Sequence, residues 1–253
     1  MKTMKTMLAL LLAAILMLTV AGCGSSNGEY QLVTAGTLTV GTNAQFPPFE
    51  FLNGTQPDGV DMALMKAVAA KLGLELKISD MEFDSLDSAL SGGKIDIIAA
   101  GFTIRPDRME KMDFTDTYYK AEQTIIVQSG SGITSKEGIS GKKIGAQSGT
   151  TGFFAAEELT DSANIKGYTN GATAVADLLN GNLDAVIIDD NPAKAYKQQH
   201  GAAVTLITGQ FDPEEYAFAV KKGNTALKDA VNKTLAEMKA DGSFDEIIAT
   251  YIQ

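Results

Sequence analysis

The sequence is poor in the residues that most often form covalent cross-links and catalytic triads. It has one cysteine and one histidine in 253 residues. One cysteine cannot form an intrachain disulfide, so the folded chain must be stabilised by packing. The single His200 leaves a serine or cysteine triad without an evident base. No Cys/His set, G-x-x-x-x-G-K-[ST] phosphate loop or D-x-[DN]-x-[DN]-G calcium loop occurs, and we expect no metal and no cofactor.

Basic side chains are also scarce. The chain has 21 Lys and Arg against 31 Asp and Glu, which gives a formal net charge of −10. An acidic surface repels the phosphates of nucleic acids and the headgroups of anionic lipids. We therefore expect no nucleic-acid partner.

Residues 1–22 have the pattern of a secretory signal. Two lysines precede an uncharged apolar run, Met7–Val20, which is too short to favour a membrane span. The next residues, Ala21 and Gly22, are small, and the only cysteine, Cys23, follows them. Val-Ala-Gly-Cys resembles the lipobox of bacterial lipoproteins, in which the cysteine is lipidated, commonly with palmitate, and becomes the mature N-terminus. The alternative is a cysteine placed by chance near a cleavage site. We expect residues 23–36 to form a polar tether to the outer face of the cell membrane, either periplasmic or extracellular.

Apolar runs of strand length alternate with amphipathic segments of helix length along the rest of the chain, as in an α/β fold. A helix is predicted over 60–73, with Gly73 as its C-terminal stop. The other expected helices cover 83–93, 152–160, 172–181, 192–200 and 224–251, the last broken near Gly242. The expected strands cover 37–42, 74–78, 95–101, 142–147, 164–169, 183–189, 203–208 and 216–220.

One structural plan occurs twice. SALSGGKIDIIAAG (88–101) and ADLLNGNLDAVIID (176–189) both run from a helix through glycine into a strand with aspartate at its second position. This echo suggests two similar α/β lobes. Open α/β sheets bind ligands beyond the carboxyl ends of their strands. The loops that follow the strands, NAQFPPF (43–49), AAGFTIRPDR (99–108), QSGTTG (147–152) and IIDDNP (187–192), are therefore candidate site loops.

Arg108 follows an apolar strand and a Gly-Phe-Thr turn. It is either a surface charge at a helix start or the planar partner of a carboxylate, which a guanidinium binds through two parallel hydrogen bonds. Thr103 and the backbone around Gly101 could donate to the same anion.

Two further loops carry groups that could bind a charged ligand. Thr150 and Thr151 start a helix, where they either cap it or help its free N–H groups bind an anion. Asp189 and Asp190 end a strand, and Asp190 suits a helix cap. As a pair they could also form a metal site or an acid/base dyad. Asp189 is suited to an ammonium group.

Aromatic residues supply candidate walls. Phe46 and Phe49 flank two prolines, and Phe83 begins a helix. We expect Phe49 in the core and Phe46, beside Asn43 and Gln45, against the apolar stem of a ligand.

From about residue 37 to residue 251 these motifs, in this order, resemble the polar amino acid-binding proteins that serve ATP-binding-cassette importers, the bacterial extracellular solute-binding proteins of family 3. The matching segments include GTNAQFPPFEF, GVDMALMKAVAAKLG, GAQSGTTG and LDAVIIDDNPA. The resemblance implies the type II periplasmic-binding-protein fold, with two α/β lobes, each an open mixed or parallel sheet flanked by helices. Lobe 1 would comprise 37–120 and 216–253, and lobe 2 would comprise 121–215. A ligand would be trapped between the lobes by hinge closure.

The resemblance also implies roles for individual residues. Arg108 would bind the α-carboxylate of an L-amino acid, and Asp189 would bind its α-ammonium. The expected ligand-binding set is Asn43, Phe46, Phe83, Gly101, Thr103, Arg108, Gln147, Thr150, Thr151 and Asp189.

Three departures from the family pattern weaken the case for a cationic ligand. Asn43 stands where many relatives have aspartate, Arg105 adds a positive charge beside the site, and Ile188 makes the corner beside Asp189 apolar. A neutral polar or apolar side chain is mildly favoured.

The resemblance implies a monomeric, non-enzymatic protein that delivers its ligand to a permease and its ATPase. Two alternatives stay open. One is an enzyme on the same scaffold that dehydrates a cyclohexadienyl substrate, for which Asp190 or Glu122 would have to act as the acid. The other is a sensory module that presents a ligand to a membrane receptor.

Overall fold

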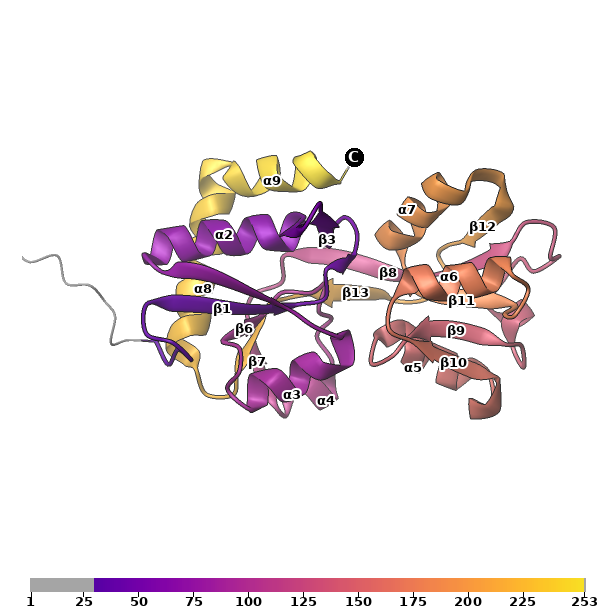
Figure 1. The fold of residues 1–253 in the computed structure, drawn as a ribbon, viewed down its shortest axis with the longest axis horizontal. Coiled ribbons are helices and arrows are strands. Elements are labelled where there is room, and N and C mark those ends of the chain that lie inside the picture. Colours follow the sequence, from indigo (N-terminus) through magenta and orange to yellow (C-terminus); the bar gives the residue numbers. More distant parts are fainter. Residues whose placement is uncertain (1–29, 253) are drawn as a thin grey trace, which may run out of the picture.

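The structure is a computed structural model that describes residues 30–252. It has two α/β lobes lying side by side, each built on its own sheet (Figure 1). The expected leader and lipidation site, residues 1–22 and Cys23, lie outside the described residues, as does the rest of the tether up to residue 29. In residues 30–252 we find no helix with the length and apolar character needed to span a membrane.

The first lobe contains a five-stranded sheet in the order β5-β1-β6-β14-β7. β1 pairs in parallel with β5 and β6, whereas β14 runs antiparallel to β6 and β7. The strands are β1 (Thr37–Thr42), β5 (Glu75–Asp80), β6 (Ile97–Ile98), β7 (Met112–Phe114) and β14 (Ala219–Lys221). A small antiparallel sheet beside it comprises β2 (Gln45–Phe46), β3 (Glu50–Asn53) and β4 (Gln56–Asp58).

Helices cover both faces of this sheet (Figure 1). They are α2 (Val60–Leu72), η1 (Phe83–Ser85), α3 (Leu86–Ser91), α4 (Pro106–Met109), α8 (Thr225–Asp241) and α9 (Ser243–Tyr251). Gly73 ends α2 in the left-handed conformation at φ 67°, which a residue with a Cβ adopts less readily. Gly242, at φ 85°, separates α8 from α9, so the break expected there is confirmed.

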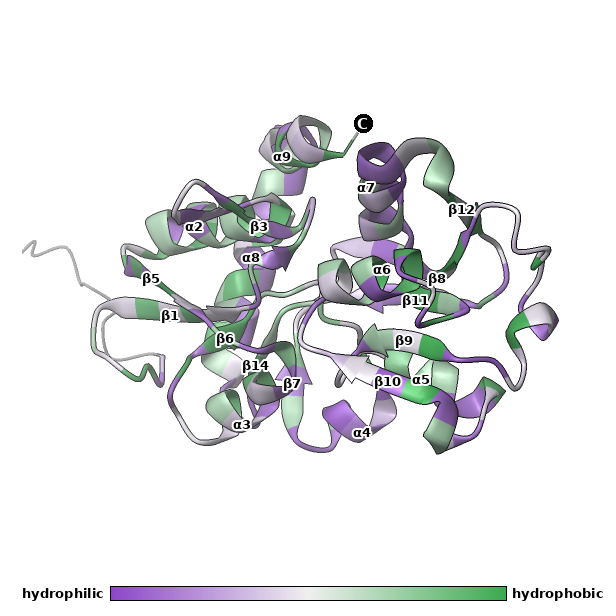
Figure 2. Ribbon diagram, turned by 45° about the vertical axis from the view of Figure 1, so that its right-hand side comes forward, coloured by the Kyte–Doolittle hydropathy of each residue, from purple (hydrophilic) through white to green (hydrophobic). Residues whose placement is uncertain are grey.

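The second lobe contains the sheet β10-β9-β11-β8-β12, with β13 paired to β8. Its strands are β8 (Tyr119–Gln128), β9 (Ile144–Gln147), β10 (Ile165–Tyr168), β11 (Ala185–Asp189), β12 (Val204–Ile207) and β13 (Pro213–Tyr216). Its helices are η2 (Glu137–Ile139), α5 (Thr151–Leu159), η3 (Ser162–Asn164), α6 (Gly171–Leu179), α7 (Asp190–His200) and η4 (Gly201–Ala203). Figure 2 shows hydrophobic residues gathered on β9, while α7 is mostly hydrophilic.

The two similar segments, 88–101 and 176–189, make the same kind of contact. Asp96, just before β6, accepts a hydrogen bond from the backbone N–H of Thr39 at 2.7 Å. Asp184, just before β11, accepts one from the backbone N–H of Lys143 at 2.9 Å. Each aspartate therefore fastens its own strand to the strand beside it.

Two antiparallel strands connect the lobes. β8 and β13 pair from Tyr119 with Tyr216 to Glu122 with Pro213, and they lie side by side between the lobes in Figure 1. The strand expected over 216–220 is interrupted, because the N–H of Ala217 donates to the carbonyl of Phe102 at 3.1 Å instead of continuing a ladder. β8, β7 and the β2–β4 sheet were not expected from the sequence. The lobe limits at 120/121 and 215/216 stay a prediction.

Candidate ligand-binding site

A cavity between the lobes is lined by all the expected site residues. It contains about 310 Å³ of space not occupied by atoms, part of it open to solvent. Ala100 is the only lining residue that the sequence did not single out. The lining residues are Asn43, Phe46, Phe83, Ala100, Gly101, Thr103, Arg108, Gln147, Thr150, Thr151 and Asp189. Their convergence is a finding, whereas their binding roles stay predictions.

Arg108 lies in the short helix α4, whose first residue is Pro106. Its side chain is 4% exposed. One guanidinium nitrogen donates to the carbonyl of Thr103 at 2.9 Å, and the other donates to the carbonyl of Gly149, across the cavity, at 3.0 Å. The guanidinium lies 3.8 Å from the centre of the Phe102 ring. Burial lowers the pKa of Arg108 to about 10, so it stays protonated at neutral pH.

Asp189, the last residue of β11, faces the cavity from the other lobe. Its carboxylate accepts a hydrogen bond from the Tyr216 hydroxyl at 2.7 Å. Burial, and after it the negative charge of Glu214, raise the pKa of Asp189 to about 7. A cation placed beside Asp189 would favour its ionised form.

The start of α5 combines a cap with open N–H groups. Thr150 is the N-cap, and its hydroxyl accepts from the N–H of Phe153 at 3.3 Å and donates to the carbonyl of Gln147 at 2.7 Å. The first N–H groups of a helix have no partner within the helix and carry its positive dipole end. Capping and anion binding are therefore compatible at this helix start.

Asn43 and Gln147 meet across the cavity. Gln147 Nε2 donates to Asn43 Oδ1 at 2.8 Å and to the carbonyl of Thr169 at 2.9 Å. Asn43 Nδ2 donates to the carbonyl of Met81 at 2.8 Å. Gln147 Oε1 accepts no hydrogen bond from the described residues, so an acceptor stays available beside the cavity.

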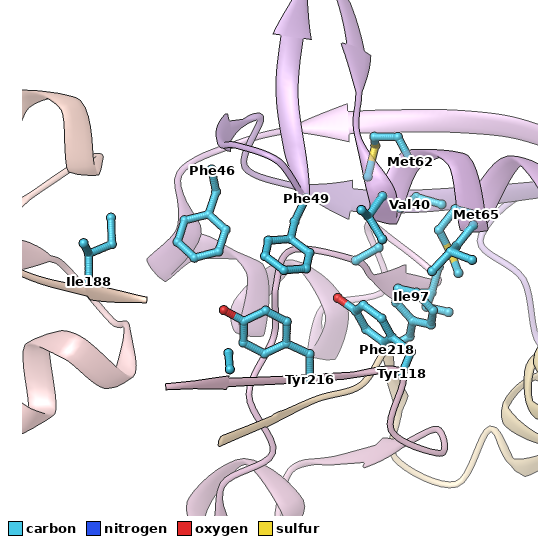
Figure 3. Packing of buried hydrophobic residues seen from close by; sticks show 14 of the residues in the cluster. Val40, Phe46, Phe49, Met62, Met65, Ile97, Tyr118, Ile188, Tyr216 and Phe218 are labelled. Atoms are coloured by element: carbon cyan, nitrogen blue, oxygen red, sulfur yellow. The ribbon is translucent and has the colours of Figure 1, made fainter. Parts of the chain in front are cut away.

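Phe46 and Phe83 form apolar walls. Figure 3 shows Phe46, Phe49 and Tyr216 grouped at the end of the first lobe, with Ile188 of the second lobe opposite Phe46. Phe49 is fully buried, as expected, and its ring centre lies 5.1 Å from that of Tyr216. Gly101, at φ 52°, passes so close to Phe46 that a Cβ there would lie 2.8 Å from the ring.

The Gly101 turn is supported by Asp61, one of two neighbouring buried carboxyl groups. Asp61, on α2, accepts from the N–H of Gly101 at 2.9 Å and from the Tyr118 hydroxyl at 2.8 Å. Burial raises the pKa of Asp61 to about 7. Burial, and after it the charge of Asp61, hold the pKa of Glu50 well above its usual range. Nothing in the apolar periodicity of α2 marks Asp61 as part of this support.

Sequence reasoning also missed Glu214 on β13. Its Oε2 accepts from the hydroxyls of Thr103 and Thr151, each at 2.8 Å. It follows a proline and precedes a second glutamate, so no local pattern separates it from its exposed neighbour Glu215.

The amino-acid sequence matches a family of known proteins. Residues 38–253 match the family model described as bacterial extracellular solute-binding proteins, family 3. The chain belongs to this family. It is 32% identical to an arginine-binding extracellular protein of Bacillus subtilis (strain 168), over 96% of each chain. It is 31% identical to an ABC transporter glutamine-binding protein of the same organism, over 100% of this chain and 98% of the relative.

Solved structures share the two-lobed fold. An ancestral arginine-binding protein bound to arginine superposes with a TM-score of 0.82 at 40% identity, over 86% of this chain and 99% of the other. An ancestral amino acid-binding protein described as a precursor of cyclohexadienyl dehydratase gives 0.80 at 35% identity, over 86% of this chain and 96% of the other. The predicted fold class and family are confirmed.

Proposed function

We propose that this chain is a lipid-anchored extracytoplasmic binding protein that captures an L-amino acid between its lobes and delivers it to an ABC importer. The observation that carries the proposal is the placement of Arg108 and Asp189 on opposite sides of one cavity, each contributed by a different lobe. Relatives named as arginine-binding and glutamine-binding proteins agree with this class of ligand.

The charges of the site suit a zwitterion. A buried charge without a partner costs several kcal/mol, so both ends of an amino acid need a counter-charge. Arg108 would bind the carboxylate, together with the first N–H groups of α5. Asp189 would bind the ammonium. Because the two partners come from different lobes, only the closed form satisfies both ends, and the ligand would favour closure by its higher affinity for that form.

We further propose that the ligand has a neutral polar side chain carrying a hydrogen-bond donor, as in glutamine. Asn43 and Gln147 are uncharged and already pair with each other. The remaining acceptor, Gln147 Oε1, suits an amide N–H, whereas a purely apolar side chain would leave it unpaired. Arg105 and Ile188 likewise supply no negative charge, which a cationic ligand side chain would need.

Closure would also produce the signal that the importer reads. It changes the relative position of the two lobe surfaces, which a permease can contact only from outside the cavity. The permease and its ATPase are separate chains. Lipidated Cys23 would keep the binding protein near them.

A thermal-shift screen tests the proposed ligand class. The chain from residue 23 onward, with Cys23→Ser to keep it soluble, is unfolded, dialysed and refolded, then screened against the twenty L-amino acids, polyamines, sugars and dicarboxylates. A ligand of the folded state at 100 Kd should add about 2.7 kcal/mol to the free energy of unfolding. Shifts with glutamine-like amino acids support the proposal. No shift with any amino acid contradicts it, and a larger shift with arginine contradicts the neutral side chain.

One alternative function has a specific observation in its favour. The pKa of Asp189 is raised to about 7, which suits a proton donor. The ancestral protein described as a precursor of cyclohexadienyl dehydratase also shares the fold. Release of water from a cyclohexadienyl substrate, measured by ultraviolet absorbance, would establish this enzyme. We expect binding without turnover.

A further inference from the structure

Glu214 connects both lobes to the crossover strand β13. A single oxygen of its carboxylate, Oε2, accepts from Thr103 Oγ1 in the first lobe at 2.8 Å and from Thr151 Oγ1 at the start of α5 at 2.8 Å. Thr103 and Thr151 line the cavity, whereas Glu214 is not among the lining residues. Glu214 therefore acts on the cavity through these two hydroxyls.

The number of hydroxyl protons fixes what the threonines can offer a ligand. A threonine hydroxyl has one proton and two lone pairs, and a carboxylate can only accept. With both protons donated to Glu214, Thr103 and Thr151 present lone pairs to the cavity. Gln123 Nε2 donates to Thr151 Oγ1 at 3.0 Å and uses one of them. Thr151 can still accept one hydrogen bond from a ligand, and Thr103 can accept at least one.

We propose that Glu214 is a positioning residue that makes Thr103 and Thr151 acceptors and thereby selects an α-ammonium over an α-hydroxyl. The inference rests on the proposed function and deepens it. Together with Asp189, the two hydroxyls give three acceptors for the three N–H donors of an ammonium group. A 2-hydroxy acid has one donor at the same place and leaves two acceptors unpaired.

The same geometry reassigns the threonines. The sequence suggested that Thr103 and Thr151 donate to the ligand carboxylate, but their protons are directed to Glu214. The carboxylate then depends on Arg108 and the backbone N–H groups at the start of α5. Glu214 also places a second negative charge near Asp189, which further favours a cation there.

The test compares amino acids with their 2-hydroxy analogues. Isothermal titration with L-glutamine and 2-hydroxyglutaramate, and with L-arginine and 2-hydroxy-5-guanidinopentanoate, gives the ratio of the two dissociation constants for each pair. The chain from residue 23 with Cys23→Ser is compared with Glu214→Met, which removes the acceptor, and Glu214→Gln, which keeps a neutral acceptor oxygen. We expect Glu214→Met to reduce the preference for the amino acid roughly tenfold, because its threonine hydroxyls are free to turn and donate to a 2-hydroxyl group. Glu214→Gln should restore most of the preference.

Controls separate positioning from structural damage. Glu215→Met, at the exposed neighbour, should leave the ratio unchanged. In a Thr103→Val, Thr151→Val background, Glu214→Met should have no further effect on the ratio. An unchanged ratio in Glu214→Met, or an equal loss in Glu214→Gln, overturns the inference while amino acid binding by the parent still supports the proposed function. A parent that binds no L-amino acid in the thermal-shift screen overturns both.

Discussion

At the scale of single residues, Arg108 is buried and donates hydrogen bonds through several guanidinium N–H groups. Its side chain is 4% exposed, and its nitrogens already contact carbonyls from both lobes. Arg108→Ala should weaken amino acid binding on the order of a hundredfold or more, because the ligand carboxylate would be buried without a cation. Titration calorimetry measures the change, and Lys111→Ala on the exposed surface serves as the control. An unchanged affinity would contradict the zwitterion site.

Asp189 predicts how binding depends on pH. Its folded-state pKa of about 7 means that the free protein carries a proton there at lower pH. The ligand ammonium requires the ionised form, so this proton must leave on binding. The affinity should therefore fall by up to about tenfold per pH unit as the pH is lowered from 7 towards 5. Calorimetry across this range measures the slope. His200→Gln should keep the slope, whereas Asp189→Asn should remove it.

The same raised pKa affects stability in the absence of ligand with the opposite sign. Between the unfolded pKa of about 4 and the folded pKa, the folded state binds more protons than the unfolded state. The pKa of Asp61 is also raised to about 7, so Asp61 changes the stability in the same direction. The midpoint of thermal unfolding of the free protein should therefore fall as the pH rises from 5 to 7. Asp61→Asn should make this dependence shallower, and a steeper fall would contradict the assignment.

At the scale of elements, two helices of the second lobe offer a matched comparison of caps. Thr150 caps α5 beside the cavity, and Asn170 caps α6 by accepting from the N–H of Thr173 at 2.9 Å. Either change to alanine should cost about 1 kcal/mol and lower the melting temperature by about 2–4 °C. Only Thr150→Ala should also weaken ligand binding, which differential scanning calorimetry and titration can separate. Equal affinities in the two variants would argue against a binding role for the start of α5.

Elements with a strong local pattern could be predicted, and those defined by distant partners could not. The helix over 60–72 follows from apolar spacing and Gly73, and the site loops follow from strands of both sheets whose carboxyl ends meet at the cavity. β8 was missed because its first half, YKAEQ, is polar and forms a strand only through β11, β12 and β13. Glu214 was missed for the same reason, since its partners Thr103 and Thr151 are distant in sequence.

At the scale of the whole molecule, a cation–π contact joins the two lobes and would stabilise the proposed closed form. The guanidinium of Arg105, in the first lobe, lies 3.6 Å from the ring centre of Phe154 on α5, in the second. A partly exposed cation–π contact contributes about 0.5–1 kcal/mol, so Arg105→Ala should weaken binding about two- to fivefold. Small-angle scattering should show a larger radius of gyration for the free variant and the parent value at saturation. Met109→Ala, on exposed surface nearby, should change neither quantity.

The strand order β5-β1-β6-β14-β7 has a consequence for biosynthesis. β8 to β12 form a contiguous stretch of chain, so most of the second sheet can assemble as soon as that stretch has been made. β14, near the C-terminus, separates β6 from β7, and the first sheet stays split until the ribosome has nearly finished. Contacts so distant in sequence form late and slowly. The side of the cavity formed between β6 and β7, which includes Arg108, is therefore completed last, and a nascent chain interrupted before β14 would lack this part of the site.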